Sequence, residues 1–214
     1  MKKYPFIHLQ KLFFANAMLL FSFSALAQKD STSGQFSLGM RSTISTFTDA
    51  GSAGLGSGGE FRIRVTKHMN TEWFADYINT NIQNLGFRRD GHIGWSVVFY
   101  LDKNPLMVGK VTPYILAGQC FDYTKVYSDY TNTSMNRWSA AAAQGGFGIT
   151  YCITSRFDFS VLSQYMMHIG TNIITQVETN NLEQNYLSVT KESGASLDGH
   201  LLITFSVNYR LGKL

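Results

Sequence analysis

The chain ends in a regular alternation of apolar and polar residues. Between Leu201 and Leu211, apolar side chains occupy every odd position, and polar side chains occupy the even positions after Leu202. Because successive side chains of a strand point to opposite faces, this pattern predicts a strand with one apolar and one polar face. Such a strand fits the wall of a transmembrane barrel, with lipid outside and a polar interior. A half-buried strand of a soluble β-sandwich has the same period, so this pattern alone leaves both architectures open.

The same period of two recurs in seven earlier segments. In the second of them, for example, Phe61 and Ile63 alternate with Arg62 and Arg64. The seven segments expected to be strands are 36–46, 58–67, 72–82, 92–101, 111–123, 138–153 and 157–169. With the last one they make about eight, which is the number in the smallest bacterial outer-membrane barrels. The predicted fold class is therefore all-β, an eight-stranded antiparallel up-and-down transmembrane β-barrel over residues 36–214.

The connections between these segments are expected to alternate in length. After the second, fourth and sixth segments they are comparatively short, at 67–71, 102–110 and 154–156. After the others they are mostly longer and polar or glycine-rich, at 47–57, 83–91, 124–137 and 171–196. Outer-membrane barrels have short periplasmic turns and long outer loops, with both termini in the periplasm. The alternation therefore favours the barrel over the sandwich.

Two of the expected long loops are candidates for contact with a protein partner. They are residues 124–137 and 171–196, and exposed aromatic side chains contribute disproportionately to interfaces. The expected binding anchors are Tyr127, Tyr130 and Trp138, which fit an aromatic girdle at the membrane surface equally well. The glycines at 54, 56, 58 and 59 superficially resemble a nucleotide-binding loop. A strand and not a helix is expected after them, so a flexible outer loop is the preferred interpretation.

The N-terminal residues predict a cleaved secretory signal peptide. Three lysines accompany an apolar run that ends near Leu26, and Ala25 and Ala27 provide the small residues that a signal peptidase reads. The run is shorter than the ~20 apolar residues that a membrane-spanning helix needs. We therefore expect residues 1–27 to be removed and residues 28–35 to form a short periplasmic segment before the barrel.

Composition and charge narrow the choice of partners. The chain has 16 Phe, 11 Tyr and 3 Trp against 3 Pro, which suits a barrel with aromatic girdles. Without the three lysines of the signal peptide, 15 basic and 14 acidic side chains remain, so the formal charge falls from +4 to +1. A nucleic-acid partner therefore has no support from charge.

If the apolar faces meet lipid, the interior of the barrel receives a nearly balanced set of charges. An eight-stranded barrel is just wide enough for its inward side chains to fill it, and unpaired charges are costly to bury. We therefore expect a paired network that closes the lumen. Its charged members are Arg41, Glu60, Arg62, Arg64, Asp76, Asp158 and Arg210, and the polar residues beside them are Gln144, Gln164 and His168.

No catalytic, cofactor or metal site is predicted. His168 and Ser163 lie on one expected strand but point to opposite faces. Asp90 and His92 stand at a loop edge, where no third group or oxyanion donor is apparent. The five His and two Cys show no metal-ligand spacing. On neighbouring hairpin strands the two cysteines would be too far apart for a disulfide, so both are expected to be free: Cys120 and Cys152.

Three short pieces of the second half carry a family resemblance. They are Thr112–Gly118, Gly145–Tyr151 with the turn Thr154–Arg156 after it, and Val207–Leu211. These pieces resemble the superfamily of small outer-membrane barrels around outer-membrane protein A and its opacity-type and virulence-related relatives. The resemblance implies an eight-stranded barrel that contacts outer-membrane lipid.

The resemblance also implies insertion by the barrel-assembly machinery. In these families a terminal strand with an aromatic-x-hydrophobic pattern is the signal that this machinery reads, and Tyr209 and Leu211 fill those positions. The chain departs from the common pattern by ending in Gly212-Lys213-Leu214 and not in an aromatic residue.

The sequence thus predicts an integral outer-membrane barrel with a plugged lumen and a structural or interaction role. That role is membrane integrity, adhesion, or service as the membrane subunit of a larger secretion or motility assembly. Two other functions stay open, namely a narrow pore for small solutes and an enzyme that modifies lipid of the outer leaflet.

Overall fold

The computed structural model describes residues 32–46, 52–130, 133–170, 173–191 and 196–213. The expected signal peptide, residues 1–27, lies outside these ranges, as do residues 28–31 of the expected periplasmic segment 28–35, and the last residue of that segment, Gln35, already belongs to the first strand. Within them, no helix is long and apolar enough to cross a membrane.

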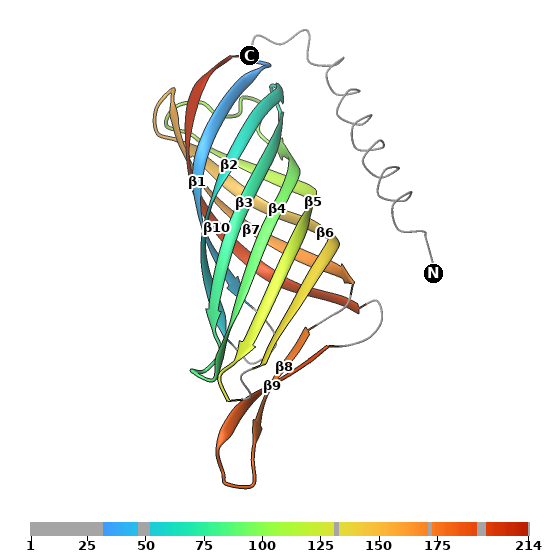
Figure 1. The fold of residues 1–214 in the computed structure, drawn as a ribbon. Coiled ribbons are helices and arrows are strands. Elements are labelled where there is room, and N and C mark those ends of the chain that lie inside the picture. The colour runs from blue at the N-terminus through green and yellow to red at the C-terminus, as the bar shows by residue number, and fades with distance from the viewer. Residues whose placement is uncertain (1–31, 47–51, 131–132, 171–172, 192–195, 214) are drawn as a thin grey trace, which may run out of the picture.

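Eight strands close into one antiparallel barrel (Figure 1). Each pairs with its neighbours along the chain, and β1 pairs with β10 to complete the circle in the order β1-β10-β7-β6-β5-β4-β3-β2. The barrel strands are β1 (Gln35–Thr46), β2 (Ala53–Thr66), β3 (Met69–Asn81), β4 (Gly86–Tyr100), β5 (Val111–Ser128), β6 (Thr133–Cys152), β7 (Phe157–Gly170) and β10 (Ser196–Lys213). A separate two-stranded hairpin consists of β8 (Ile173–Thr179) and β9 (Asn185–Lys191). The predicted up-and-down barrel is confirmed, and the β-sandwich is excluded.

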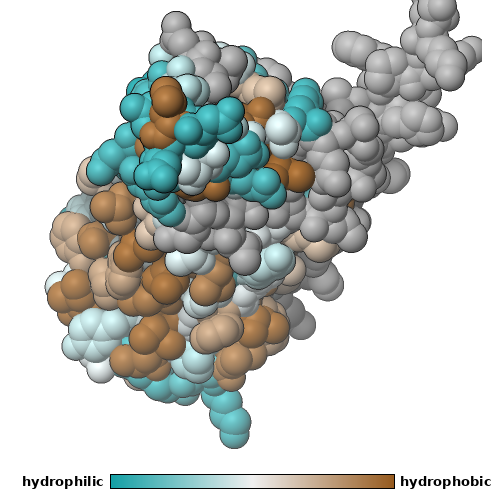
Figure 2. All heavy atoms as spheres, turned by 90° about the horizontal axis from the view of Figure 1, so that it is seen from below, coloured by the Kyte–Doolittle hydropathy of each residue, from teal (hydrophilic) through white to brown (hydrophobic). Residues whose placement is uncertain are grey.

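Each strand turns its apolar residues outward and its polar residues inward. Met40, for example, is 79% exposed, whereas its neighbour Arg41 is 2% exposed. Seen from the hairpin side, hydrophobic residues cover much of the visible flank of the barrel, and hydrophilic residues gather in a separate region (Figure 2). An exposed apolar wall is costly in water and stable in lipid, so this exterior is that of a membrane barrel. Its larger members include Leu38, Leu55, Trp73, Ile93, Phe99, Ile115, Phe121, Phe147, Tyr165 and Val207.

The strands extend further than the sequence predicts at the end opposite the chain termini. There β4 begins at Gly86 and not at His92, and β5 continues to Ser128. The connections 82–85 and 129–132 are consequently short, while 101–110 at the other end is longer, so the predicted alternation of loop lengths is wrong. Hydrogen bonds of an antiparallel pair join backbone groups and do not depend on the side chains. The strands can therefore continue beyond the segments whose outward side chains are apolar.

The glycine-rich run before Glu60 belongs to β2, so the predicted flexible loop is wrong from Ala53 onward. A Cβ atom at Gly56 would stand 2.5 Å from Cγ1 of Ile78 on β3. Gly56 thus has no room for a larger side chain, because Ile78 of the neighbouring strand fills the space.

Three apolar clusters divide the lumen along its length. We call the end where β1 begins and β10 ends the terminal end, and the opposite end the hairpin end (Figure 1). The terminal cluster is Val98, Tyr100, Tyr114, Leu116 and Leu162. The middle cluster is Phe74, Ile78, Cys120, Ala142, Met166 and Leu202. The third is Ile82, Val126, Ile173 and Leu187, in which the last two residues come from β8 and β9. The hairpin therefore packs its own apolar side chains against residues at the hairpin end of the barrel.

Both cysteines are free and buried, as predicted. Cys120 lies in the middle cluster, where its Sγ is 3.4 Å from Sδ of Met166. Cys152 lies at the end of β6, where Nη2 of Arg210 donates to its Sγ over 3.0 Å.

Candidate functional site

Arg62 stands at the centre of a charge network inside the terminal half of the barrel. Its Nη2 is 2.8 Å from Oε1 of Glu60, and its Nε donates to Oε2 of Glu72 over 2.8 Å. Its Nη1 reaches Oδ1 of Asp158 on β7, 3.4 Å away. The guanidinium also donates to Ser160 on β7 and Ser206 on β10. One side chain from β2 therefore contacts β3 on one side and, beyond β1 on the other side, β10 and β7.

Arg41 on β1 binds the same carboxylates from the other side. Its Nη1 is 3.1 Å from Oε1 of Glu72 and 3.5 Å from Oε2 of Glu60. Its Nε is 3.2 Å from Oδ1 of Asp76. The guanidinium lies 4.4 Å above the ring of Phe74, where the negative face of the aromatic ring favours a cation. Arg41 thus contacts the middle apolar cluster through an aromatic ring, which stabilises its positive charge at this boundary.

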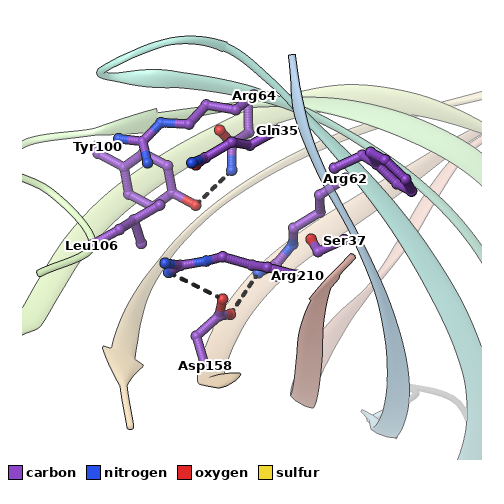
Figure 3. Close-up of a pocket in the computed structure, with 10 residues that line it drawn as sticks. Gln35, Ser37, Arg62, Arg64, Tyr100, Leu106, Asp158 and Arg210 are labelled. Atoms are coloured by element: carbon purple, nitrogen blue, oxygen red, sulfur yellow. Dashed lines mark hydrogen bonds and ion pairs between the residues drawn. The ribbon is translucent and has the colours of Figure 1, made fainter. Parts of the chain in front are cut away.

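The terminal mouth holds the remaining charges (Figure 3). Nη2 of Arg210 is 3.5 Å from Oδ2 of Asp158, so Asp158 lies between two guanidinium groups. Arg64 donates to the backbone carbonyls of Thr66 and Lys67 and so stabilises the β2–β3 turn. The cavity left among these residues is only about 20 Å³, with Tyr100 and Leu106 also in its lining. That volume holds about one water molecule.

The structure places the expected network residues in the lumen but alters their roles. Arg41, Glu60, Arg62, Asp76 and Asp158 share contacts, whereas Arg64 binds backbone carbonyls. The sequence interpretation missed Glu72, the acid that joins the two central arginines. Its position has the same parity as Asp76, and this signal could have found it. Of the other predicted polar residues, Gln144 donates to Ser96 over 2.6 Å, and Gln164 is buried.

A second polar layer lies between the middle cluster and the hairpin end. Asp90 and His92 are buried there on β4, so their predicted position at a loop edge is wrong. Nε of Arg88 donates to both carboxylate oxygens of Asp90, and Thr124 donates to Oδ1 over 2.6 Å. His92 lies beside two other histidines, His168 on β7 and His200 on β10. The layer is polar although it is enclosed by apolar clusters on both sides.

The hairpin end carries the expected contact residues. The side chain of Tyr130 is 57% exposed and packs against Tyr186 of β9, with ring centroids 5.2 Å apart. Tyr127 stacks on Phe87 on the outer wall at 5.1 Å, which is a girdle position. The backbone of Trp138 lies in β6 and pairs with Tyr123. Tyr130 therefore contacts the hairpin through Tyr186 and Asn180.

Two groups outside the membrane-spanning part have perturbed acid–base equilibria. Tyr186 donates to Oε2 of Glu178 over 2.6 Å, and this hydrogen bond to the neutral phenol raises the pKa of Tyr186. Asp102 accepts hydrogen bonds from Nζ of Lys110 and from the backbone N–H of Asn104, which lower the pKa of its carboxyl group. The hairpin therefore contains a side-chain pair whose geometry depends on a protonated tyrosine.

The terminal strand carries the expected assembly signal near its end. Tyr209 packs on Phe157 with ring centroids 4.8 Å apart, and its hydroxyl accepts a hydrogen bond from Nη1 of Arg156. Leu211 is exposed on β10. Recognition of these residues by an assembly machinery stays a prediction.

Comparison with known sequences gives little guidance. No family model matches the chain. A UPF0145 protein of Thermoplasma acidophilum is 36% identical over 77 residues, which make up 35% of this chain and 63% of that protein. The chain thus spans less than two thirds of the length of this curated relative.

Comparison with solved structures shows the fold. Neisserial surface protein A matches with a TM-score of 0.53 and 12% identity, over 83% of this chain and 96% of the other. The outer membrane protein OprG of Pseudomonas aeruginosa matches at 0.52 and 11%, over 86% and 98%. A major outer membrane protein of Thermus thermophilus matches at 0.51 and 11%, over 83% and 98%. With its closed ring of eight strands and its apolar exterior, the chain has the fold of the small outer-membrane β-barrels, as the sequence predicts.

Proposed function

We propose that the protein is an integral outer-membrane barrel with a sealed lumen, which acts through its surface and hairpin and not as a passage. The observation that carries this proposal is the reach of Arg62 from β2 across the interior to Asp158 on β7 and Ser206 on β10. Breaking a buried pair costs about 3–5 kcal/mol, and each 1.4 kcal/mol is about a factor of ten in population. Opening a path through this network would therefore make the open state rarer by roughly a hundredfold or more for each pair broken.

Conductance across a planar bilayer tests the seal. The refolded wild-type barrel is expected to show no steady conductance. A steady conductance that changes when Arg62 or Arg64 is replaced by alanine would establish the narrow pore and overturn the sealed barrel. The small size of the cavity beside these arginines, about 20 Å³, supports the sealed state over the pore.

The lipid-modifying alternative has weaker support. In the second polar layer, Ser45 Oγ stands 3.3 Å from Nδ1 of His200. Both residues are buried inside the lumen, away from any outer-leaflet substrate. Mass analysis of the outer-leaflet lipid from cells with and without the protein tests this alternative, because an enzyme would change the lipid.

We assign the interaction role to the β8–β9 hairpin. With an even number of barrel strands both termini lie on one side, and in outer-membrane barrels that side is the periplasm. The hairpin then projects outside the cell, where its tip presents Leu182 at 76% exposure beside Asn180 and Gln184. Beside the hairpin, Tyr130 is 57% exposed and packs against Tyr186, and exposed aromatic side chains are enriched at protein interfaces. Adhesion or membership of a larger envelope assembly would both use such a surface.

Photo-crosslinking from the hairpin tests this role. A benzophenone side chain at Leu182 is expected to yield protein adducts in intact cells. The same group at Met40, which is equally exposed but on the apolar wall, is the matched control and is expected to yield lipid adducts. Equal yields of protein adducts from the two sites would rule out a specific hairpin contact.

The terminal strand has a separate proposed partner, the barrel-assembly machinery. Replacing Tyr209 and Leu211 by alanine is expected to reduce the amount of folded barrel in the membrane while leaving refolding in detergent intact. A barrel that inserts normally with both replacements would remove these residues from the signal.

A further inference from the structure

Three histidines from opposite walls of the barrel meet in the second polar layer. His92 comes from β4, His168 from β7 and His200 from β10, and β4 is separated from β7 by two strands around the circle. All three side chains are buried. One ring nitrogen of each lies within 4.8 Å of the others. We propose that these three histidines bind one divalent first-row transition-metal ion, with Zn²⁺ as the preferred ion, inside the lumen.

Neighbouring side chains hold two of the rings in an orientation suited to a metal. Nδ1 of His168 stands 3.0 Å from Oδ2 of Asp122, and Nδ1 of His200 is 3.3 Å from Oγ of Ser45. A carboxylate or hydroxyl that takes up the Nδ1 hydrogen leaves the lone pair of Nε2 for a metal. Such partners behind metal-ligating histidines are a general feature of metal sites.

The hydrogen-bond status of the rings also indicates a ligand. Among the described residues, neither ring nitrogen of His92 makes a hydrogen bond, and the same holds for both ring nitrogens of His168, whose Nδ1 lies within ion-pair distance of Asp122. A buried polar group without a partner costs free energy, and metal ligation would offset that cost.

The spacing is compatible with metal binding after a small rotation of the rings. Bonds of about 2.0–2.1 Å in a tetrahedral site place two ligand nitrogens roughly 3.3 Å apart. The ring nitrogens lie up to 4.8 Å apart here, so each pair must approach by at most about 1.5 Å to reach the separation in a zinc site. The ring centroids are 4.9 Å apart for His168 and His200, 5.5 Å apart for His92 and His200, and 6.1 Å apart for His92 and His168, so the rings stand close enough to share one ion after a small movement.

The donor set selects the class of metal. Three imidazoles suit Zn²⁺, Cu²⁺ or Ni²⁺, whereas Mg²⁺ and Ca²⁺ prefer oxygen ligands. Among the acids around the histidines, Asp76 is paired with Arg41 and Asp90 with Arg88. Asp122 lies directly behind His168 and places a negative charge at the site. A bound ion would link β4 to β7 and β10 across the lumen.

Metal retention by the refolded barrel tests the proposal. The protein is refolded in detergent with Zn²⁺ or Co²⁺ present, so that the ion need not enter a closed barrel, and is then dialysed. The wild type is expected to retain one ion per barrel, and Co²⁺ is expected to give the intense visible absorption of a tetrahedral nitrogen-ligated site. His92→Gln, His168→Gln and His200→Gln should each lower the affinity at least tenfold, and Asp122→Asn by roughly 10–100-fold.

His68→Gln is the matched control, because His68 lies in the β2–β3 turn and stacks on Phe99 of the outer wall. It should bind metal like the wild type. Folding is checked by heat-modifiable migration on a gel, and if the lumen variants fail to fold, the Co²⁺ spectrum of the wild type decides. A folded wild-type barrel that retains neither ion, or a loss of binding in His68→Gln equal to that in His92→Gln, would overturn the proposal. The three rings would then be a packed layer of neutral imidazoles, and the sealed-lumen function would stand unaffected.

Discussion

Glu72 divides its two carboxylate oxygens between two arginines. Oε1 lies near Nη1 of Arg41 and Oε2 accepts from Nε of Arg62, so one acid neutralises charge on β1 and β2 at once. The planar guanidinium groups match the planar geometry of the carboxylates, so the buried charges are paired with one another. The proposed seal of the lumen thus rests on a few specific contacts as well as on volume.

Replacing Glu72 by glutamine should destabilise the barrel by about 3–5 kcal/mol, since it breaks two buried ion pairs at once, one with Arg41 and one with Arg62. Urea unfolding in detergent, followed by tryptophan fluorescence, measures the free energy of unfolding. Glu178→Gln on the exposed hairpin is the control and should leave the midpoint unchanged. Equal midpoints for the two variants would mean that the network adds no stability.

Tyr186 should titrate above the ordinary tyrosine range. Its hydrogen bond to Glu178 needs the neutral phenol, so the bond is present below the usual tyrosine pKa and is lost as the pH rises through the raised pKa. The difference in phenolate absorbance between the wild type and Tyr186→Phe reports this pKa. In Glu178→Gln the pKa should return toward its ordinary value, and an unchanged pKa would contradict the proposed cause.

At the level of the strand, simple parity predicts most of what the structure shows. The polar positions of 36–46 and 157–169, such as Arg41 and Asp158, point inward because a strand has a period of two. Parity also places Glu72 and His92 inside, although neither was included in the expected network. The strand ends were missed because charged residues such as Arg88 and Lys125 resemble loop residues in a linear sequence. Whether such residues belong to a strand depends on how two strands pair, which one segment of the sequence does not show.

Glycines on the two faces of β4 should respond differently to alanine. A Cβ atom at Gly94 would stand 2.5 Å from Cβ of Cys120 and 2.7 Å from Cζ of Phe74, whereas one at Gly91 would meet nothing within 4 Å. Gly94→Ala should therefore cost about 1–3 kcal/mol through overpacking. Gly91→Ala, on the same strand, should cost less, and the urea midpoints compare the two. A smaller loss in Gly94→Ala would show that the inner face is loosely packed.

At the level of the whole molecule, contacts across the lumen lie beyond the reach of the sequence. His200 comes just before the predicted last strand, and nothing in its neighbours indicates that it meets His92 from the opposite wall. Arg62 and Ser206 are separated by 144 positions. Such contacts depend on the closure of the circle and on the stagger of all eight strands, and these cannot be read from one segment at a time.

Replacing residues 173–190 by a short glycine-serine linker tests whether the charge network or the β8–β9 hairpin blocks conductance through the lumen. It removes Ile173 and Leu187 from the mouth and uncovers Ile82 and Val126. The barrel should still fold, and a planar bilayer should still show no steady conductance, because the charge network lies deeper in the lumen. Leu182→Ala at the hairpin tip is the control for surface effects. Steady conductance in the linker variant alone would make the hairpin, and not the network, the seal.

The position of the charges along the chain bears on the order of assembly. Arg41, Glu60, Arg62, Glu72 and Asp76 all belong to β1, β2 and β3, which are consecutive and adjacent. This first meander can therefore neutralise most of its own buried charge before the later strands exist, with only short loops to close. The later wall supplies Asp158 and the hydroxyls of Ser160 and Ser206. When the barrel closes, the later strands then dock onto β1, β2 and β3, whose buried charges are already paired. The step that joins the most distant parts of the chain therefore buries few unpaired charges.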